Sequence, residues 1–265
     1  MANGGDMVTR DTAWPEGTPC WADLGVSDIG KATAFYSGLF GWDIPPGPPE
    51  TGGYSVASLN GHATVGLGPK MSPPEVPAAW MTYLASDDAD KTAAKVTKAG
   101  GTLIVEPMDV LAFGRMAIGL DTTGGVFGIW QGREMTGAGL ANEPSALTWN
   151  EYFSRDFEKA KAFYGAVFGY EYGDMSGEGF TYATLLVSGH EVGGIGAYPP
   201  GTPESVPAAW SVYFGTSDTN ASVAAVVKAG GKVTREAADS PYGRVATVAD
   251  DQGAAFNLIS VGSGG

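Results

Sequence analysis

The sequence predicts an α+β fold made of two similar modules in tandem. Three observations support it: the chain repeats itself, each half alternates strand-type and helix-type segments in one order, and 43% of the residues are hydrophobic. That share is enough for a sizeable core, despite 41 glycines and 17 prolines. The 265 residues fit two domains of ordinary size.

Short identical or similar sequence segments recur in the two halves of the chain. A shift of 128 residues places the run KATAFY at 31–36 on the run KAKAFY at 159–164. After a two-residue insertion, the tetrapeptide PAAW at 77–80 coincides with PAAW at 207–210. We therefore expect a flexible tail, a first module, a second module and a closing tail at 1–13, 14–141, 142–261 and 262–265, respectively.

The first module opens with a strand followed by a helix. The segment 20–26 is a short apolar strand, and the helix covers 29–39. Ser27 or Asp28 can accept hydrogen bonds from free N–H groups of the first helical turn. Gly41 can take the left-handed conformation that ends a helix.

The remaining elements follow from turn and cap signals. Asn60-Gly61 is a two-residue hairpin signal between two strands. A second helix opens at Asp88 and ends at Gly100-Gly101. The other segments are predicted strands, at 54–59, 62–67, 80–85, 102–107, 115–121 and 126–131. The second module is expected to follow the same order.

Composition limits the partners. The chain has 29 acidic and 15 basic residues, a net charge of −14, which repels nucleic acid and anionic membrane surfaces. We expect a small-molecule ligand and neither of those partners. A single cysteine, Cys20, forbids an internal disulfide and fits a reducing cytoplasm. No apolar run is long enough for a membrane helix or a signal peptide.

Several motifs occur in the same order in both halves. An Asp-capped helix carrying AFY leads to FGW at 40–42 or FGY at 168–170, and each half closes with an Asp, a Gly and an apolar strand, at 121–130 and 250–259. From Trp14 to Ser260 the chain resembles the vicinal oxygen chelate superfamily. Its members include glyoxalase I, bleomycin-resistance proteins, fosfomycin-resistance enzymes and extradiol dioxygenases. The chain is most similar to the two-module actinobacterial branch of the CFP30B type.

The resemblance implies a fold and a place for the site. Each glyoxalase-like module would hold either two βαβββ motifs or one such motif with an extra helix and strands. Curved mixed sheets would pair around a cavity, and the cavity would be the site. The modules would pair within a monomer or between the chains of a homodimer.

The resemblance also implies where metal ligands would stand, and none of those positions carries His or Glu. The first, middle and last ligand positions correspond to Trp21 and Trp149, to Trp80-Met81 and Trp210-Ser211, and to Gly128 and Asn257. Indole donates hydrogen bonds but does not bind metals. The two histidines, His62 and His190, each follow a turn glycine. We therefore expect no metal and no cofactor.

Two carboxylates are the predicted catalytic groups. Alternation along the first strand places Trp21 and Asp23 on the face opposite Leu24, and Trp149 and Glu151 are their copies. Burial would raise a carboxyl pKa toward neutrality, which favours proton transfer. Equally, these carboxylates could fix the pairing of the modules. In the last strand, Asn257 could orient a carbonyl or a hydroxyl.

Aromatic and basic residues are the predicted substrate contacts. Trp80, Trp210, Tyr83 and Tyr213 could wall a site for flat ligands, as could Trp21 and Trp149, although the PAAW tryptophans could instead close the core. Arg115 and Arg244 follow turn glycines and could hold a ligand carboxylate, or pair with acids at the surface.

Three functions remain open at this point. The first is a metal-independent acid–base enzyme, a tailoring lyase, isomerase or hydroxylase-type protein, acting on a small or polycyclic organic substrate. The second is a non-catalytic protein that sequesters an aromatic ligand, as resistance proteins do. The third, a metal-dependent glyoxalase or dioxygenase, is disfavoured by the missing ligands.

Overall fold

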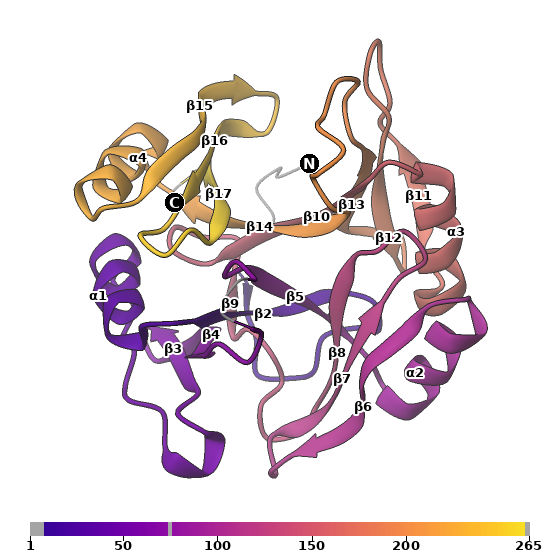
Figure 1. Cartoon of the computed structure of the whole chain (residues 1–265), viewed down its shortest axis with the longest axis horizontal. Coiled ribbons are helices and arrows are strands. Elements are labelled where there is room, and N and C mark those ends of the chain that lie inside the picture. The colour runs from indigo at the N-terminus through magenta and orange to yellow at the C-terminus, as the bar shows by residue number, and fades with distance from the viewer. Residues whose placement is uncertain (1–7, 74–75, 263–265) are drawn as a thin grey trace.

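A computed structural model describes residues 8–73 and 76–262, and each module forms its own curved, mixed sheet (Figure 1). The first module contains β2 (Pro19–Val26), α1 (Ile29–Phe40), the 3-10 helix η1 (Pro49–Thr51), β3 (Ser55–Leu59), β4 (His62–Pro69), β5 (Trp80–Ala85), α2 (Ala89–Lys98), β6 (Thr102–Val110), β7 (Gly114–Leu120) and β8 (Val126–Gly132). The second contains β10 (Leu147–Ser154), α3 (Phe157–Phe168), β11 (Glu171–Asp174), β12 (Tyr182–Val187), β13 (His190–Ala197), β14 (Ala209–Thr216), α4 (Thr219–Lys228), β15 (Lys232–Ser240), β16 (Gly243–Ala249) and β17 (Ala255–Ser260).

Each sheet is built from two motifs that meet at its centre. In the first module the strand order is β3-β4-β2-β5-β8-β7-β6, with β2 parallel to β4, β5 parallel to β8, and β2 antiparallel to β5. The second module repeats this order as β12-β13-β10-β14-β17-β16-β15, with β11 added beyond β12. The predicted α+β tandem fold is confirmed, with two motifs in each module.

The predicted helix start and end are found where the sequence places them. The Asp28 side chain accepts a hydrogen bond from the Lys31 N–H at 3.0 Å, and Gly41 ends α1 with φ of 72°. The strand β11 was not predicted. Its sequence, EYGD, has weak strand propensity, and its pairing with β12 supplies the stabilisation instead.

The two faces of each sheet have different surroundings. On β5, Thr82 and Leu84 are fully buried on the face that the helices cover. Asp23 and Tyr83 lie on the other face, because Trp21 pairs with Tyr83 and side chains alternate along a strand. We call this second face of each sheet its open face.

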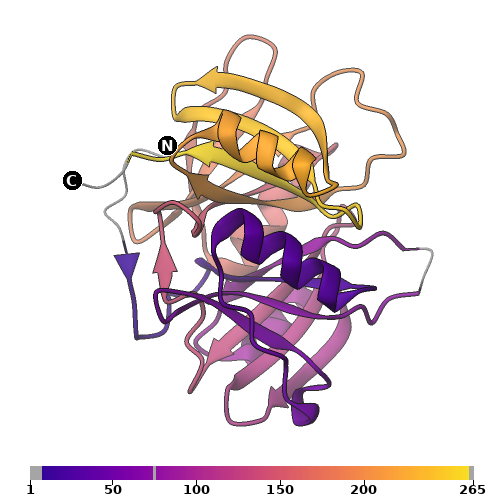
Figure 2. The same cartoon turned by 90° about the vertical axis from the view of Figure 1, so that its left-hand side faces the viewer.

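The modules pack through their helix-covered faces. The Thr82 hydroxyl donates to the Asn150 side chain at 2.9 Å, between β5 and β10. At one end Tyr36 donates to Asp250, and at the other Tyr164 donates to Asp121, both at 2.9 Å. Accordingly α1 lies beside α4 and α2 beside α3 (Figures 1 and 2). The modules therefore pair within one chain, with their open faces directed away from each other.

The chain ends modify one predicted boundary. Residues Val8–Thr9, placed in a tail by the sequence, form β1 and pair with β9 (Leu140–Ala141) at the junction of the modules. Residues 1–7 and 263–265, the rest of the predicted tails, lie outside the described residues. Among the helices that the structure describes, none has the length and apolar character needed to cross a membrane.

Candidate functional site

A carboxylate held by two phenols lies on the open face of the first module. Asp23 on β2 accepts hydrogen bonds from Tyr83 on β5 at 2.9 Å and from Tyr54, just before β3, at 3.3 Å. The indole N–H of Trp21 donates to the Tyr54 hydroxyl at 2.9 Å. Strands β2 and β5, with the residue that precedes β3, thus bring one acid, two phenols and one indole together. We call these residues the Asp23 cluster.

The second module repeats the arrangement with a longer acid. Glu151 on β10 accepts hydrogen bonds from Tyr182, at 3.0 Å, and from Tyr213. The indole of Trp149 donates to the Tyr182 hydroxyl at 3.1 Å. We call these residues the Glu151 cluster.

The two clusters differ in which carboxylate oxygens are used. Tyr54 and Tyr83 both donate to Oδ2 of Asp23, and within the described residues nothing bonds Oδ1. By contrast, Tyr182 donates to Oε2 of Glu151 and Tyr213 to Oε1. The Asp23 carboxylate therefore keeps an oxygen available for a ligand, whereas each oxygen of Glu151 already has a partner.

Burial tunes the Asp23 cluster toward proton transfer. Loss of hydration raises the pKa of Asp23 from 3.8 to about 6, and the hydrogen bonds from Tyr83 and Tyr54 oppose the rise. Burial, together with the nearby charge of Asp23, raises the pKa of both tyrosines well above 10. At neutral pH the phenols are therefore hydrogen-bond donors and most Asp23 carboxyls are ionised.

Burial also raises the pKa of Glu151, with hydrogen bonds from Tyr213 and Tyr182 opposing. The two acids thus share the direction and the cause of the shift. Two features distinguish them: the unbonded oxygen of Asp23, and the positive charge of Arg235, which lowers the pKa of Glu151 and has no counterpart at Asp23.

Glycines make room for the phenols. A Cβ at Gly66 would overlap the Tyr54 hydroxyl, and a Cβ at Gly128 would overlap the Tyr83 ring. In the second module Gly194 makes the same room for Tyr182, but Asn257 stands at the position of Gly128. These glycines are needed because rings lie flat against the backbone.

The positions implied for metal ligands do lie side by side. In register across the sheet, Trp21 pairs with Tyr83, and Tyr83 pairs with Gly128. Tyr83 therefore lies directly between the first and last positions, and the expected middle pair, Trp80-Met81, lies further along the same strand. An indole, a phenol and a glycine are not the His and carboxylate set that divalent metals need. Among residues 8–73 and 76–262, no three His, Cys, Asp or Glu side chains are grouped to hold a metal ion. The residues do not fit a metal, and we derive no step through one.

The predicted catalytic residues do not share one site. Asp23 lies on the open face of one sheet, and Glu151 and Asn257 lie on the open face of the other, which points away from it. The Asn257 amide is also held in place, accepting from Thr247 at 2.7 Å and donating to the Val212 carbonyl at 3.3 Å. The prediction that Asp23, Glu151 and Asn257 act together in one cavity is therefore wrong.

The PAAW tryptophans lie between the modules instead of at a ligand site. Trp80 packs against Phe214 of the second module at 5.1 Å between ring centroids, and Trp210 is buried in one cluster with Leu84 of the first. Each indole also donates to a tyrosine of its own module, Trp80 to Tyr36 at 3.3 Å and Trp210 to Tyr164 at 2.8 Å. Because Trp80 and Tyr83 are three residues apart on one strand, they face opposite ways. The substrate-binding assignment of these two tryptophans is wrong.

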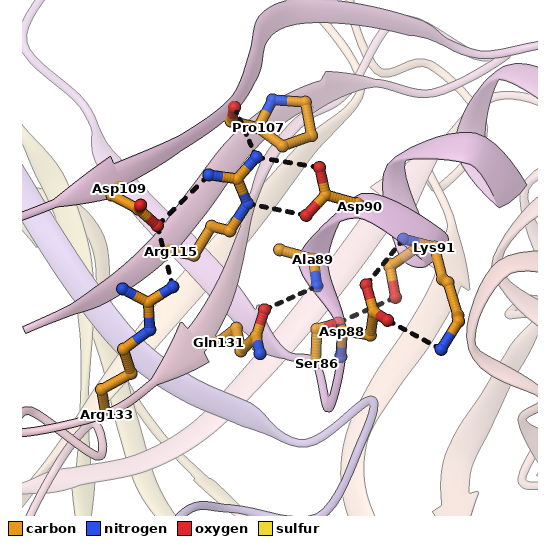
Figure 3. A network of polar contacts seen from close by, with 11 residues as sticks. Ser86, Asp88, Ala89, Asp90, Lys91, Pro107, Asp109, Arg115, Gln131 and Arg133 are labelled. Carbon is orange, nitrogen blue, oxygen red and sulfur yellow. Dashed lines mark hydrogen bonds and ion pairs between the residues drawn. The ribbon is translucent and has the colours of Figure 1, made fainter.

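The predicted substrate-binding arginines are engaged with surface acids. Figure 3 shows Arg115 between Asp90 of α2, which it binds at 2.7 and 2.8 Å, and Asp109 of β6 at 3.2 Å. Arg244 repeats this with Asn220 at 3.0 Å and Asp239 at 2.9 Å. Both arginines join a helix start to an edge hairpin, and these bonds occupy the guanidinium groups that the sequence predicted as ligand clamps.

Replacing Arg115 with lysine is expected to have a small effect. Lysine keeps the charge but loses the paired hydrogen bonds, and the partner Asp90 is largely exposed. The free energy of unfolding in urea should fall by less than about 1 kcal/mol. The affinity for the aromatic dye quinizarin should equal that of the wild type. A lower affinity in the variant would show that Arg115 contacts the ligand.

Two residues of the clusters were missed from the sequence. Tyr54 and Tyr182 are aligned by the repeat, but Tyr54 stands just before β3 and Tyr182 begins β12, each 31 residues from its acid. The glycines at 66 and 194, also aligned by the repeat, were the available signal that a ring crosses the neighbouring strand.

Comparison with known proteins agrees with this fold. The chain is 40% identical over 259 residues to the putative glyoxylase CFP32 of Mycobacterium tuberculosis, covering 95% of this chain and 98% of that protein. It is 34% identical over 264 residues to the anthracycline biosynthesis protein DauV of a Streptomyces species, covering 94% and 95%. The Mn(II)-bound glyoxalase of Novosphingobium aromaticivorans has a similar fold, with a TM-score of 0.66, 16% identity and coverage of 93% and 83%.

The family model for the glyoxalase, bleomycin-resistance protein and dioxygenase superfamily matches the chain twice, over residues 20–128 and 146–258. These two ranges correspond to the two sheets. The chain belongs to the glyoxalase/bleomycin resistance protein/dioxygenase superfamily.

Proposed function

We propose that this protein is a metal-independent tailoring enzyme that moves a proton on a flat, polycyclic aromatic substrate, with Asp23 as the acid–base group. The observation that carries the proposal is the Asp23 carboxylate, with both phenols on Oδ2 and none on Oδ1. A pKa of about 6 allows a carboxylate to take up and return a proton near neutral pH.

The step is a proton transfer without a redox change. Oδ1 of Asp23 takes a proton from a C–H bond next to a substrate carbonyl, and the C–H electron pair forms the enolate. The Asp23 carboxyl then returns the proton to another atom of the same substrate, so the net reaction is an isomerisation. Tyr54 and Tyr83 hold Oδ2 and fix the direction of Oδ1.

The surroundings of Asp23 favour an apolar ring system. Pairing across the sheet places Met81, Met116, Ile118 and Trp130 on the same open face, and the first three are partly exposed. Such surfaces bind flat rings by removing apolar area from water. Two relatives, DauV and DnrV, are named as anthracycline biosynthesis proteins, and anthracyclines are polycyclic aromatic compounds.

Hydrogen exchange tests the proposal directly. The wild-type protein in heavy water is expected to speed deuterium incorporation into beta-tetralone, a bicyclic aromatic ketone with acidic C–H bonds, as followed by NMR. Because only ionised Asp23 accepts a proton, the catalysed rate should rise as the pH increases through about 6 and then level off. A rate that does not change between pH 4.5 and 8 would exclude Asp23 as the base.

Sequestration is the second candidate, and the apolar residues around Asp23 favour it. A resistance-type protein would bind quinizarin without exchange or any other turnover. Tight dye binding, combined with no catalysed exchange for any bound aromatic ketone, would support this alternative.

A further inference from the structure

The open faces of the two modules carry different residues at matched positions. In the first module one row crosses five strands in register, through Trp21, Tyr83, Gly128, Ile118 and Val105. In the second module the same row reads Trp149, Tyr213, Asn257, Thr247 and Arg235. The aromatic pair is kept, whereas three apolar or small residues are replaced by an amide, a hydroxyl and a guanidinium.

The neighbouring row, which contains Asp23 or Glu151, is also more polar in the second module. Asp23 pairs with Met81 in the first module, whereas Glu151 pairs with Ser211 in the second. The second open face is therefore the more polar one at four matched positions. The concentration of these differences on one face points to a different ligand.

Arg235 is the charged residue of this row and is available. It is exposed, and it makes no hydrogen bond or ion pair with any residue that the structure describes. Arg115, Arg133, Arg155 and Arg244 each bond a protein oxygen. Glu151, in the neighbouring row, feels the positive charge of Arg235, which opposes the rise of its pKa, but its oxygens already accept hydrogen bonds from Tyr182 and Tyr213.

We propose that the open face of the second module is a separate binding site for an aromatic carboxylic acid, with Arg235 holding the carboxylate. Thr247 and Asn257 bond each other, which leaves the Thr247 oxygen to accept from a ligand hydroxyl and the second amide N–H of Asn257 to donate to a ligand carbonyl. Tyr213 and Trp149 provide the stacking surface. In a chain of net charge −14, binding an organic anion requires such a local positive group.

The spacing of the strands sets the size of the ligand. Arg235, Thr247, Asn257 and Tyr213 stand on the neighbouring strands β15, β16, β17 and β14 (Figure 1). Three strand spacings of about 4.8 Å span roughly 14 Å along the sheet. The matching ligand is an acid with two or three fused rings.

Replacing Arg235 with methionine tests this site. The probe is anthraquinone carboxylate, and its uncharged hydroxymethyl analogue is the comparison, each titrated into the full chain by calorimetry. A bidentate guanidinium–carboxylate pair predicts that Arg235→Met weakens carboxylate binding by about ten- to hundredfold and leaves the uncharged analogue unchanged. Raising the salt concentration should weaken only the carboxylate in the wild type.

Two controls make the test specific. Arg133→Met removes an exposed arginine of the first module and should bind the carboxylate like the wild type. Asp23→Asn should also leave carboxylate binding unchanged. The result for this binding site is therefore independent of the proposed catalysis at Asp23. Equal affinity of the wild type and Arg235→Met for the carboxylate, or an equal loss in Arg133→Met, would overturn the proposal.

Discussion

Asp23→Asn is expected to lower the catalysed exchange of beta-tetralone hydrogens by about a hundred- to ten-thousandfold, the usual contribution of a positioned acid–base group. The amide has nearly the shape of the carboxylate and can still accept a hydrogen bond from Tyr54 or Tyr83, but it cannot take up a proton. The rate is measured by NMR in heavy water at pH 7.5.

The matched control is Glu151→Gln, which makes the same change in the other module. Since the oxygens of Glu151 already accept from Tyr182 and Tyr213, this variant should keep the wild-type exchange rate. A loss in Glu151→Gln equal to that in Asp23→Asn would contradict the assignment of catalysis to the first module.

The same Asp23 variant has an opposite effect on stability. Because its pKa is about 6 in the folded protein and 3.8 ordinarily, Asp23 binds more protons in the folded state between these values. Its contribution to the free energy of unfolding is thus fully present below pH 3.8 and is lost as the pH rises through 6, by up to about 3 kcal/mol. From pH 4 to pH 7.5, Asp23→Asn should therefore gain stability relative to the wild type in urea denaturation. Parallel curves for the two proteins would show that the Asp23 pKa is not raised.

Phe214→Ala is expected to reduce the free energy of unfolding by about 3–5 kcal/mol. Phe214 is fully buried, and its ring centroid lies 5.0 Å from Phe40, 5.1 Å from Trp80 and 5.4 Å from Trp42, all in the first module. Removing the ring would leave a cavity where the modules meet, so the loss includes both buried area and the lost aromatic contacts. Urea denaturation followed by circular dichroism measures the change.

Phe180→Ala is the control for this prediction, because that ring is 55% exposed. It should change the free energy of unfolding by less than about 0.5 kcal/mol. A loss below 1 kcal/mol in Phe214→Ala would mean that the two modules do not depend on this contact for their stability.

The sequence by itself determined the repeated unit and most of its elements. Asp28 and Gly41 predicted the ends of α1, and the strand 80–85 was predicted with the bounds that the structure shows. Caps, turns and alternation are local effects, so they can be read from neighbouring residues. For the same reason alternation placed Trp21 and Asp23 together on one face.

Only the tertiary structure decided which of these residues act together. Pairing between distant strands brought Tyr54 and Tyr83 to Asp23, and packing of the helix-covered faces turned Glu151 and Asn257 away from it. The same packing buried Trp80 and Trp210 between the modules. A repeat makes equivalent residues look alike in sequence, but register and module packing are long-range properties that no local pattern carries. Local alternation therefore predicted the face on which Asp23 lies, and only the fold showed which side chains bond it.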